Sequence, residues 1–244
     1  MSAPSISAVI ITYNEAENIS GCISAIKPAV QEIIVVDSFS TDNTIQIAEK
    51  LGAKVYQHKW EGYAQTKNYA NALCSSEFII SLDADEVVSD QLLASITKVD
   101  LQRPNAAYSF NRLTNYCGTF IKHAGWYPDR KLRFFRKNDA KWEGEHVHEK
   151  LILNQGVREI ELQGNLLHYS YNSKQEHVDR ERKYAALAAE QKPQRSAVIA
   201  YLSYASKFLR MYILKYGFVY GSLGFQLCHI AAKGKIWKYQ YSTS

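Results

Sequence analysis

The chain has few cysteines and nothing that suggests a sulfur-bound metal or a disulfide framework. Its four cysteines are Cys22, Cys74, Cys117 and Cys228, and no two of them form a C-x-x-C pair. This scattered spacing indicates neither a zinc site nor paired disulfides. The first residues, Met1-Ser2-Ala3-Pro4, place no basic stretch ahead of an apolar one, so no secretory signal is expected. We therefore expect a cytoplasmic protein with reduced thiols.

Long apolar runs are also missing. The longest uncharged stretch near the end, residues 216–232, is at the short limit for a membrane span and contains glycine, serine, glutamine and histidine. We expect a re-entrant or interfacial helix pair there rather than a helix that crosses a bilayer.

Acidic residues are absent from the last part of the chain. Residues 191–244 contain no Asp or Glu, whereas they contain eight Lys and Arg residues interleaved with aromatic side chains. This composition suits an anionic membrane surface, where Tyr and Trp lie at the level of the headgroups. The alternatives are a helical tail that packs on the core and a tail that binds nucleic acid, but the rest of the chain carries no nucleic-acid motif. We expect an anionic membrane surface as a partner and no nucleic acid.

The first hundred residues alternate short apolar runs with helical patterns. Strands are expected at residues 7–11, 32–37, 54–58 and 78–82, and helices at about 17–28, 40–51, 63–74 and 89–99. Four such units predict an α/β fold with a mostly parallel, doubly wound sheet. Shorter strands are expected at residues 108–110, 131–135, 150–153 and 159–162, and a polar helix at 175–192.

Three carboxylates follow the fourth expected strand. The apolar run Phe78-Ile79-Ile80-Ser81-Leu82 leads directly into Asp83-Ala84-Asp85-Glu86. Open α/β sheets bind their ligands at the carboxyl ends of the strands. Carboxylates crowded at such an end repel one another, and a divalent cation that bridges to a phosphate-bearing ligand offsets the repulsion. We expect Asp85 to be a metal ligand; a simple charge at a helix start is the alternative.

The turn after the first strand, Thr12-Tyr13-Asn14-Glu15, has no glycine. It therefore matches neither the dinucleotide fingerprint nor a P-loop. Its polar side chains suit hydrogen bonds to a base and a ribose instead. Asp37 ends the second strand, where α/β nucleotide binders often hold a ribose or a base edge. Helix capping is the alternative for Asp37 and for Asp42.

Three motifs, in this order, resemble the family 2 glycosyltransferases of the GT-A fold. They are ITYNE at residues 11–15, VDSFSTDNT at 36–44 and LDADE at 82–86. In that family the second motif usually reads Asp-Ser-Gly-Ser-Thr-Asp-Gly-Thr, whereas Phe39 and Asn43 replace the glycines here. The replacement affects the geometry of the turn more than the assignment. Lys67-Asn68 matches a basic residue plus Asn that commonly follows the third strand of the family.

The resemblance implies a GT-A catalytic domain over residues 1–172, with a nucleotide-binding half (1–100) and an acceptor half (101–172). A basic, aromatic, helical C-terminal extension over residues 173–244 would follow and lie on the membrane surface. Asp85 would coordinate Mg²⁺ or Mn²⁺ on the diphosphate of a UDP-hexose donor, where the metal stabilises the departing nucleoside diphosphate. The residues implied to hold the nucleoside are Thr12, Asn14, Glu15, Asp37, Lys67 and Asp83.

Transfer of a sugar also requires a base that takes the proton of the acceptor hydroxyl. Residues 142–151, WEGEHVHEKL, resemble a Trp-x-Gly…Val-His-Glu element found in a bacterial subset of the family. Glu149 is the first candidate for the base and Glu145 the second, and His148 is a candidate ligand of the metal or the diphosphate. The alternative is that these carboxylates are ordinary loop or strand-edge charges.

A basic run at residues 129–137 provides a further candidate. Strand alternation places Leu132 and Phe134 on one face and Lys131 and Arg133 on the other. We expect Arg133 to meet a phosphate or an anionic acceptor. A solvated edge strand is the alternative.

The motifs together most resemble the small bacterial enzymes that add glucose to the inner core of lipopolysaccharide. This implies an inverting, metal-dependent hexosyltransferase that takes glucose from UDP-glucose. The acceptor would be a lipid-linked glycan at the inner face of the cytoplasmic membrane, with the enzyme peripheral to that membrane. Two alternatives are a non-catalytic scaffold that binds a nucleotide sugar and an Asp-x-Asp phosphatase. The phosphatase class carries its aspartate pair after the first strand and a Thr where Val87 stands here.

Overall fold

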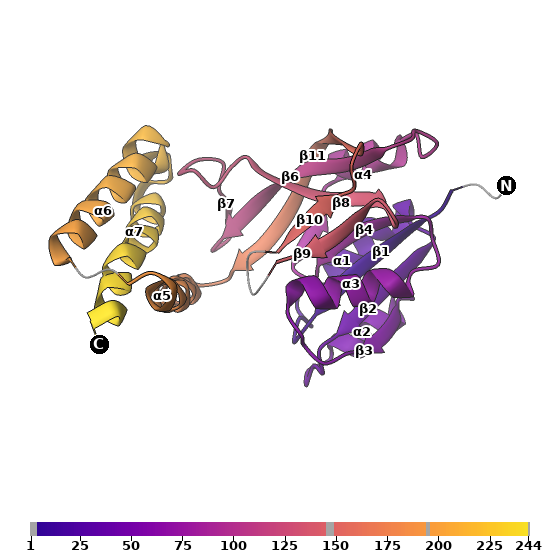
Figure 1. The fold of residues 1–244 in the computed structure, drawn as a ribbon, viewed down its shortest axis with the longest axis horizontal. Helices are drawn as coiled ribbons and strands as arrows, with labels where there is room; N and C mark the ends of the chain where they lie inside the picture. Colours follow the sequence, from indigo (N-terminus) through magenta and orange to yellow (C-terminus); the bar gives the residue numbers. More distant parts are fainter. Residues whose placement is uncertain (1–3, 145–148, 194–195, 244) are drawn as a thin grey trace. The chain divides into compact units, whose positions relative to one another are not determined.

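The computed structural model describes residues 4–144, 149–193 and 196–243 (Figure 1). Within these residues the chain forms two compact units. Unit 1 comprises the described residues of Met1–Arg112 and Asp129–His168, and unit 2 comprises those of Leu113–Pro128 and Tyr169–Ser244.

Unit 1 begins with four parallel strands. They are β1 (Ile6–Thr12), β2 (Glu32–Asp37), β3 (Lys54–Gln57) and β4 (Phe78–Asp83), and they lie in the order β3-β2-β1-β4. β1 is buried along its whole length, as expected for a strand that helices cover on both faces. The predicted parallel, doubly wound arrangement is confirmed.

Side chains of β1 alternate between two hydrophobic cores, one on each face of the sheet. Ala8 and Ile10 pack in the core that includes Ile23 and Leu92, whereas Val9 packs in the core of the other face. The helices that contribute are α1 (Ile19–Ile26) with its 3₁₀ extension η1 (Lys27–Ala29), α2 (Thr44–Lys50), α3 (Tyr63–Leu73) and α4 (Asp90–Thr97). The loops at the carboxyl edge of the sheet therefore follow strands that are packed on both faces.

The start of two helices shows what the local sequence could and could not specify. The helix predicted from about residue 89 begins there, because the Ser89 hydroxyl caps α4 by accepting a hydrogen bond from the Leu92 N–H at 3.3 Å. The prediction that α2 begins near Ser40 is wrong, since the helix begins at Thr44. The Ser40 hydroxyl instead binds Asp37.

The same sheet continues with antiparallel strands. They are β5 (Glu86–Val88), β6 (Ala106–Tyr116), β7 (Thr119–Phe120), β8 (Asp129–Arg136) and β11 (Arg158–Tyr171), in the order β4-β8-β6-β11-β5 with β7 beside β6. β9 (Ala140–Glu143) and β10 (Lys150–Leu153) form a separate two-stranded sheet. β6 and β11 are much longer than predicted. The prediction was too short because charged and polar residues such as Arg112 and Glu161 interrupt the apolar pattern of these strands. In the structure these residues make polar contacts in the sheet.

A β-bulge changes the direction of side chains on β8. Leu132 pairs with Ser109 and Phe134 pairs with Tyr108, so Arg133 is an extra residue without a partner in the ladder. Leu132 therefore packs in one core and Phe134 in the other, and the predicted shared face is wrong. β8 also lies between β4 and β6, which excludes the edge-strand alternative for Arg133.

Unit 2 is built from the C-terminal helices. They are α5 (Lys174–Gln191), α6 (Ala197–Leu209), the π-helical turn η2 (Arg210–Leu214), the 3₁₀ turn η3 (Gly217–Tyr220) and α7 (Gly221–Thr243). His177 is buried with its Nδ1 3.1 Å from the Tyr116 hydroxyl, and burial lowers the pKa of His177 to about 4. The imidazole is thus neutral at ordinary pH. Among the described residues, no helix has the length and apolar character that crossing a membrane requires.

Candidate active site

The loops that follow β1 and β2 are tied to each other by their own polar side chains. The Ser40 N–H donates to Asp37 Oδ2 at 2.8 Å, and the Ser40 hydroxyl binds the same carboxylate. The Asn14 N–H donates to Ser40 Oγ at 2.7 Å, while Asn14 Oδ1 accepts from the Thr41 N–H at 2.8 Å. Phe39, which stands where the family has glycine, adopts a positive φ of 63°. The substituted turn therefore keeps a backbone conformation that glycine favours.

Asp42 has a structural role in this corner. Its carboxylate accepts from the Thr44 N–H at 3.0 Å and from the Ala16 N–H at 3.2 Å, so it links the first residue of α2 to the loop after β1, while Asn43 is the N-cap residue. Thr12 differs, because its hydroxyl is buried and has no hydrogen-bond partner among the described residues. A buried hydroxyl left without a partner costs stability unless a ligand satisfies it. Thr12 is therefore well suited to contact a bound molecule.

Asp83 ends β4 and lies between two buried cations. The Lys67 Nζ atom is 3.0 Å from Asp83 Oδ1, and the Arg133 Nη2 atom is 3.0 Å from Oδ2. Burial would raise the pKa of Asp83, but the Lys67 ammonium and the Arg133 guanidinium outweigh it and hold that pKa well below its usual range. The carboxylate is consequently ionised and held in one orientation.

Glu86 organises the turn behind Asp83. It is fully buried, and its Oε2 accepts from the Asp83 N–H at 3.0 Å. Its Oε1 lies 3.4 Å from both Arg112 Nη1 and Arg133 Nη2. Burial would lower the pKa of Arg133, but Glu86, Asp83 and Glu149 raise it further above its already high value. We refer to Lys67, Asp83, Glu86, Arg112, Arg133 and Glu149 as the Asp83 network.

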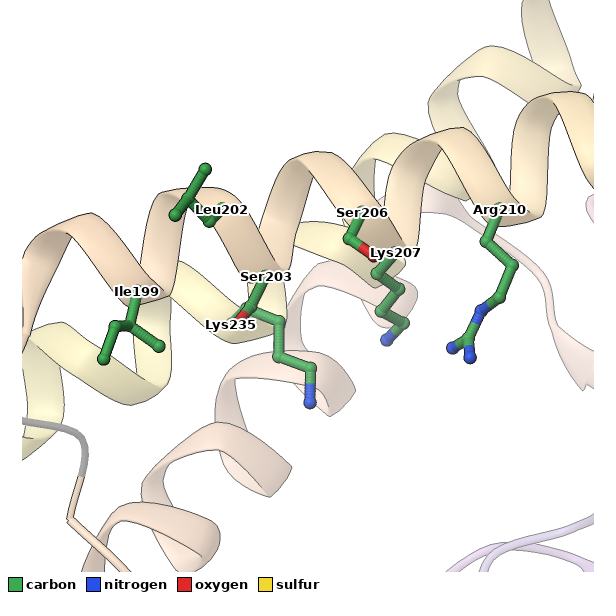
Figure 2. Close-up of a pocket in the computed structure, with 7 residues that line it drawn as sticks. All are labelled: Ile199, Leu202, Ser203, Ser206, Lys207, Arg210 and Lys235. Carbon is green, nitrogen blue, oxygen red and sulfur yellow. The ribbon is translucent and has the colours of Figure 1, made fainter.

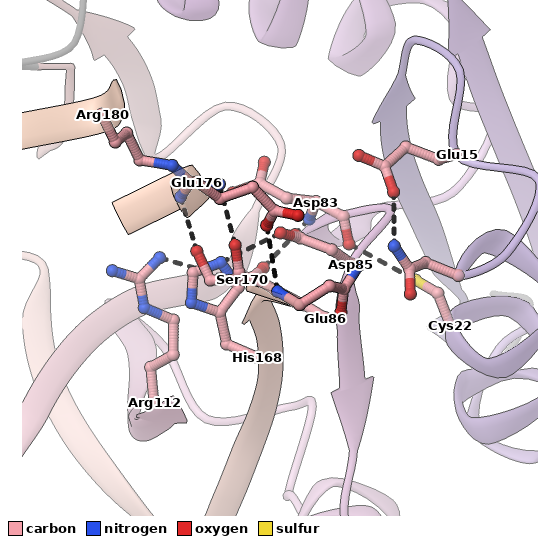
Figure 3. A network of polar contacts seen from close by, with 12 residues as sticks. Glu15, Cys22, Asp83, Asp85, Glu86, Arg112, His168, Ser170, Glu176 and Arg180 are labelled. Atoms are coloured by element: carbon pink, nitrogen blue, oxygen red, sulfur yellow. Dashed lines mark hydrogen bonds and ion pairs between the residues drawn. The ribbon is translucent and has the colours of Figure 1, made fainter. Parts of the chain in front are cut away.

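Asp85 stands apart from these cations. Its Oδ2 lies 3.1 Å from His168 Nε2 (Figure 3). Among the described residues, no Lys or Arg forms an ion pair with Asp85. The contact arises because β11 pairs with β5, which places His168 opposite Glu86 in the ladder. One carboxylate oxygen and one imidazole nitrogen are suitable donors for a divalent cation. The described residues contain no group of three His, Cys, Asp or Glu that could hold a metal ion.

Glu149 and Trp142 border the Asp83 network from the β9–β10 side. Glu149 Oε1 lies 3.5 Å from Lys67 Nζ. The Trp142 ring lies over two cations, 4.6 Å from Lys67 Nζ and 5.3 Å from Arg133 Cζ. Asn68 fixes β9 to α3, since its side chain donates to the Trp142 carbonyl at 2.8 Å and accepts from the Trp142 N–H at 3.0 Å. The Lys67-Asn68 pair thus anchors both Asp83 and the strand that leads toward Glu149.

The structure groups the predicted site residues in two places within unit 1. Lys67, Asp83, Arg133 and Glu149 share the Asp83 network, with Asp85 next to it in the chain. Thr12, Asn14 and Asp37 lie at the ends of the neighbouring strands β1 and β2 or just beyond them, and Glu15 Oε2 accepts from Asn18 Nδ2 at 2.7 Å. The predicted roles of Glu145 and His148 fall on residues outside those that the structure describes.

Sequence reasoning missed His168, Arg112 and the structural part played by Glu86. His168 lies in a stretch of β11 that was not expected to be strand, and no local pattern links it to Asp85. Arg112 lies in the unpredicted half of β6, where its Nη2 pairs with Asp129 Oδ2 at 2.9 Å. Glu86 was recognisable as part of the acidic cluster but not as a buried partner of arginines.

Cys22 lies beside the same carboxylates but is not a candidate nucleophile. Its Sγ atom is 3.6 Å from the Asp83 carbonyl oxygen, and the side chain is fully buried. Burial and the neighbouring Glu86 and Asp85 carboxylates raise the pKa of the Cys22 thiol well above its usual value. Because the thiolate is the reactive form, this thiol is inert.

Replacing Arg133 should show how strongly the Asp83 network depends on its buried cations. We expect Arg133→Gln to lower the free energy of unfolding by about 3–5 kcal/mol, because it leaves Asp83 and Glu86 short of a buried partner. Arg130→Gln is the matched control on the same strand, since Arg130 pairs with Glu161 at an exposed position and should cost less than about 1 kcal/mol. Urea unfolding of the full chain measures both. Equal small losses in the two variants would contradict the role given to Arg133.

Comparison with known proteins agrees with this geometry. Residues 7–159 match the family model described as glycosyl transferase family 2. An uncharacterised glycosyltransferase of Rickettsia typhi, RT0209, is 30% identical over 234 residues, which are 90% of this chain and 80% of that protein. LpsC of Rhizobium meliloti, a lipopolysaccharide core biosynthesis glycosyltransferase, is 27% identical over 197 residues, 76% of this chain and 71% of that protein. The crystal structure of TarS from S. aureus shares the fold with a TM-score of 0.51 and 17% identity, over 89% of this chain and 46% of that one. The chain therefore belongs to glycosyl transferase family 2: it has the GT-A fold and is a glycosyltransferase that moves a sugar from a nucleotide-sugar donor.

Proposed function

We propose that the protein is an inverting, metal-dependent hexosyltransferase that moves glucose from UDP-glucose to a lipid-linked glycan acceptor of the lipopolysaccharide inner core. The observation that carries the proposal is the Asp85–His168 pair, which lies at the end of β4 beside an Asp83 carboxylate fixed by two cations. Support for the acceptor class comes from the relative LpsC, which is named for lipopolysaccharide core biosynthesis.

The uridine would be held at the corner formed by the loops after β1 and β2. The unpartnered Thr12 hydroxyl is available for a hydrogen bond to the nucleoside. Asp37 and Asn14 hold the corner in shape through Ser40, and they are expected to contact the base or ribose directly. Asp83 would accept a hydrogen bond from a ribose hydroxyl. Lys67 would act as a positioning residue through its ion pair with Asp83.

A divalent cation fits the donors present at Asp85. No Lys or Arg in the described chain forms an ion pair with this carboxylate, and the His168 nitrogen lies beside it. Mg²⁺ or Mn²⁺ held by Asp85 and His168 would neutralise charge on the diphosphate as the nucleoside diphosphate departs. Asp83 orients the donor beside this point, and Arg133, fixed on the bulge of β8, contributes positive charge toward phosphate or an anionic acceptor.

Glu149 is the proposed base. It would take the proton of the acceptor hydroxyl as that oxygen attacks the anomeric carbon, and a single displacement of this kind inverts the configuration there. Lys67 Nζ lies 3.5 Å from Glu149 Oε1, and this ion pair helps to orient the carboxylate. Glu145 remains the second candidate.

The acceptor would be presented at a membrane. The described part of residues 191–244 carries basic and aromatic side chains without an acidic one, which suits the anionic inner face of the cytoplasmic membrane. We propose that the protein associates peripherally with this surface through its C-terminal helices.

Donor binding tests the proposal directly. In a thermal-shift panel with Mn²⁺, UDP-glucose at about 100 times its Kd should stabilise the protein by roughly 2.7 kcal/mol, because it binds the native state alone. We expect a larger rise in Tm for UDP-hexoses than for GDP- or dTDP-sugars, and we expect EDTA to remove most of that rise. Slow release of UDP in the absence of acceptor would distinguish the enzyme from a non-catalytic scaffold. A panel in which no UDP-sugar raises Tm would contradict the proposal.

A further inference from the structure

Helix α6 presents a continuous apolar stripe to solvent. Val198, Leu202, Ala205 and Leu209 follow one another at spacings of four, three and four residues, so their side chains share one side of the helix. Val198 is 69% exposed, Leu202 66% and Leu209 51%, and Ala205 is also exposed. Large contiguous apolar patches on a folded protein mark a surface that another molecule covers.

The exposed apolar surface continues beyond the end of α6. Ile213 and Leu214 of η2 and Phe218 and Val219 of η3 are all exposed, with Leu214 reaching 71%. The stripe and these side chains therefore belong to one stretch of chain, residues 198–219. The packing of unit 2 does not require these large apolar side chains to remain in solvent.

A groove with three cationic side chains flanks the stripe. It has a volume of about 390 Å³, and its lining residues are Ile199, Leu202, Ser203, Ser206, Lys207, Arg210 and Lys235. Lys235 comes from α7 and the others from α6 and the first residue of η2. Figure 2 shows Lys207, Arg210 and Lys235 extending toward the same side of α6. Two ammonium groups, one guanidinium and two hydroxyls are the donors that a phosphate group requires.

The groove has spare positive charge. Among the described residues, no carboxylate forms an ion pair with Lys207, Arg210 or Lys235, although Lys207 Nζ donates to the Ala231 carbonyl at 2.5 Å. The carboxylate of Glu181 on α5 interacts electrostatically with Lys207 and Lys235. One carboxylate against three cations leaves an excess that favours an anionic ligand.

We propose that this groove binds the phosphate of an anionic lipid headgroup while α6 lies in the plane of the bilayer surface. The apolar stripe would enter the acyl boundary, and the groove at its flank would then stand at the depth of the headgroup phosphates. Ile199 and Leu202 line the same groove and would contact the first methylenes of the lipid. This inference deepens the proposed membrane association, on which it rests, and names the lipid chemistry and the residues that recognise it.

The charge pattern favours a lipid surface over a second copy of the chain. Residues 191–244 contain no Asp or Glu, so two copies that met through α6 would bring like charges together. An anionic bilayer is complementary to the same surface both in charge and in its apolar interior.

Co-sedimentation of the full chain with vesicles tests the groove. We expect binding to phosphatidylcholine vesicles that contain phosphatidylglycerol and little binding to phosphatidylcholine alone. The double substitution Arg210→Gln with Lys235→Gln should reduce the partition coefficient by about 10- to 30-fold, because each lost cation at the surface weakens binding by roughly three- to fivefold. Lys174→Gln with Lys183→Gln is the matched control, because it removes the same charge from exposed positions on α5 outside the groove and should cost less than about threefold.

Any one of the following results would overturn the inference. Equal losses in the two double variants would show diffuse basic charge rather than a site, and competition by millimolar inorganic phosphate would show a site for the free anion. A wild-type chain that ignores anionic vesicles, or dimerises through α6 in sedimentation equilibrium, would remove the lipid interpretation. Circular dichroism confirms that the variants are folded. UDP release without vesicles should be unchanged in both double variants, so failure of the transferase proposal is read separately from failure of the groove.

Discussion

Asp85→Asn is expected to reduce turnover with UDP-glucose by about 10³-fold, because loss of several kcal/mol of transition-state stabilisation by a metal corresponds to a few powers of ten in rate. The substitution removes a carboxylate that lies outside the Asp83 network, so the fold should survive. Calorimetry with UDP, in the presence and absence of Mn²⁺, measures the loss of metal-dependent binding, and a UDP-release assay measures the loss of rate.

Asp90→Asn provides the control for this prediction. It makes the same chemical change five positions along the chain, at an exposed carboxylate in the first turn of α4. We expect it to leave both UDP affinity and turnover within about twofold of the original protein, since an exposed charge at a helix start contributes about 1 kcal/mol or less and only to stability. If Asp85→Asn binds UDP as the unaltered chain does, with and without Mn²⁺, the metal assignment is wrong.

The parallel half of the sheet could be predicted because burial on both faces leaves a simple signal. β1, β2 and β4 are nearly uninterrupted apolar runs, and each is followed by polar residues at the carboxyl edge. The position of Asp83 and Asp85 follows from that rule alone. The metal-ligand hypothesis therefore needed no knowledge of which strands are neighbours.

The antiparallel half carried a weaker signal because its strands are partly polar. β11 includes Glu161 and His168, and β6 includes Arg112, so hydrophobic periodicity reveals only fragments of them. A contact such as that between His168 and Asp85 depends on the pairing of β11 with β5, which joins distant parts of the chain. The bulge at Arg133 likewise depends on register and not on residue type, and it reversed the predicted alternation on β8.

The geometry of the Asp83 network bears on how catalysis would be divided among its members. Arg133 and Lys67 each contact Asp83, and each also contacts a second carboxylate, Glu86 and Glu149 respectively. Their charges are thus largely committed to holding carboxylates in place. Asp85, which lies outside the network, and Glu149, at its edge, are partly exposed and are the carboxylates expected to act on a ligand. Substitutions of the network members other than Glu149 should therefore change stability first, whereas substitutions at Asp85 and Glu149 should change rate.

Glu149→Gln is expected to lower turnover by roughly 10²–10⁴-fold while leaving donor affinity unchanged, because general-base catalysis contributes about that factor and the amide keeps the shape of the carboxylate. The variant loses one ion pair to Lys67, but Lys67 keeps its 3.0 Å contact with Asp83. Donor binding should consequently survive. Rapid-quench measurement of sugar transfer to acceptor, with UDP-glucose affinity measured in parallel by calorimetry, separates the two effects.

Glu143→Gln is the matched control, since Glu143 ends β9 at an exposed position and pairs in the ladder with Lys150, the residue after Glu149. Its turnover should stay within about threefold, because an exposed charge of this kind contributes little to catalysis or stability. A Glu149→Gln variant with near-normal turnover would move the base elsewhere, and Glu145 would be tested next. If both variants lost turnover equally, the effect would belong to the negative charge of the β9–β10 region as a whole, and no single carboxylate there would be the base.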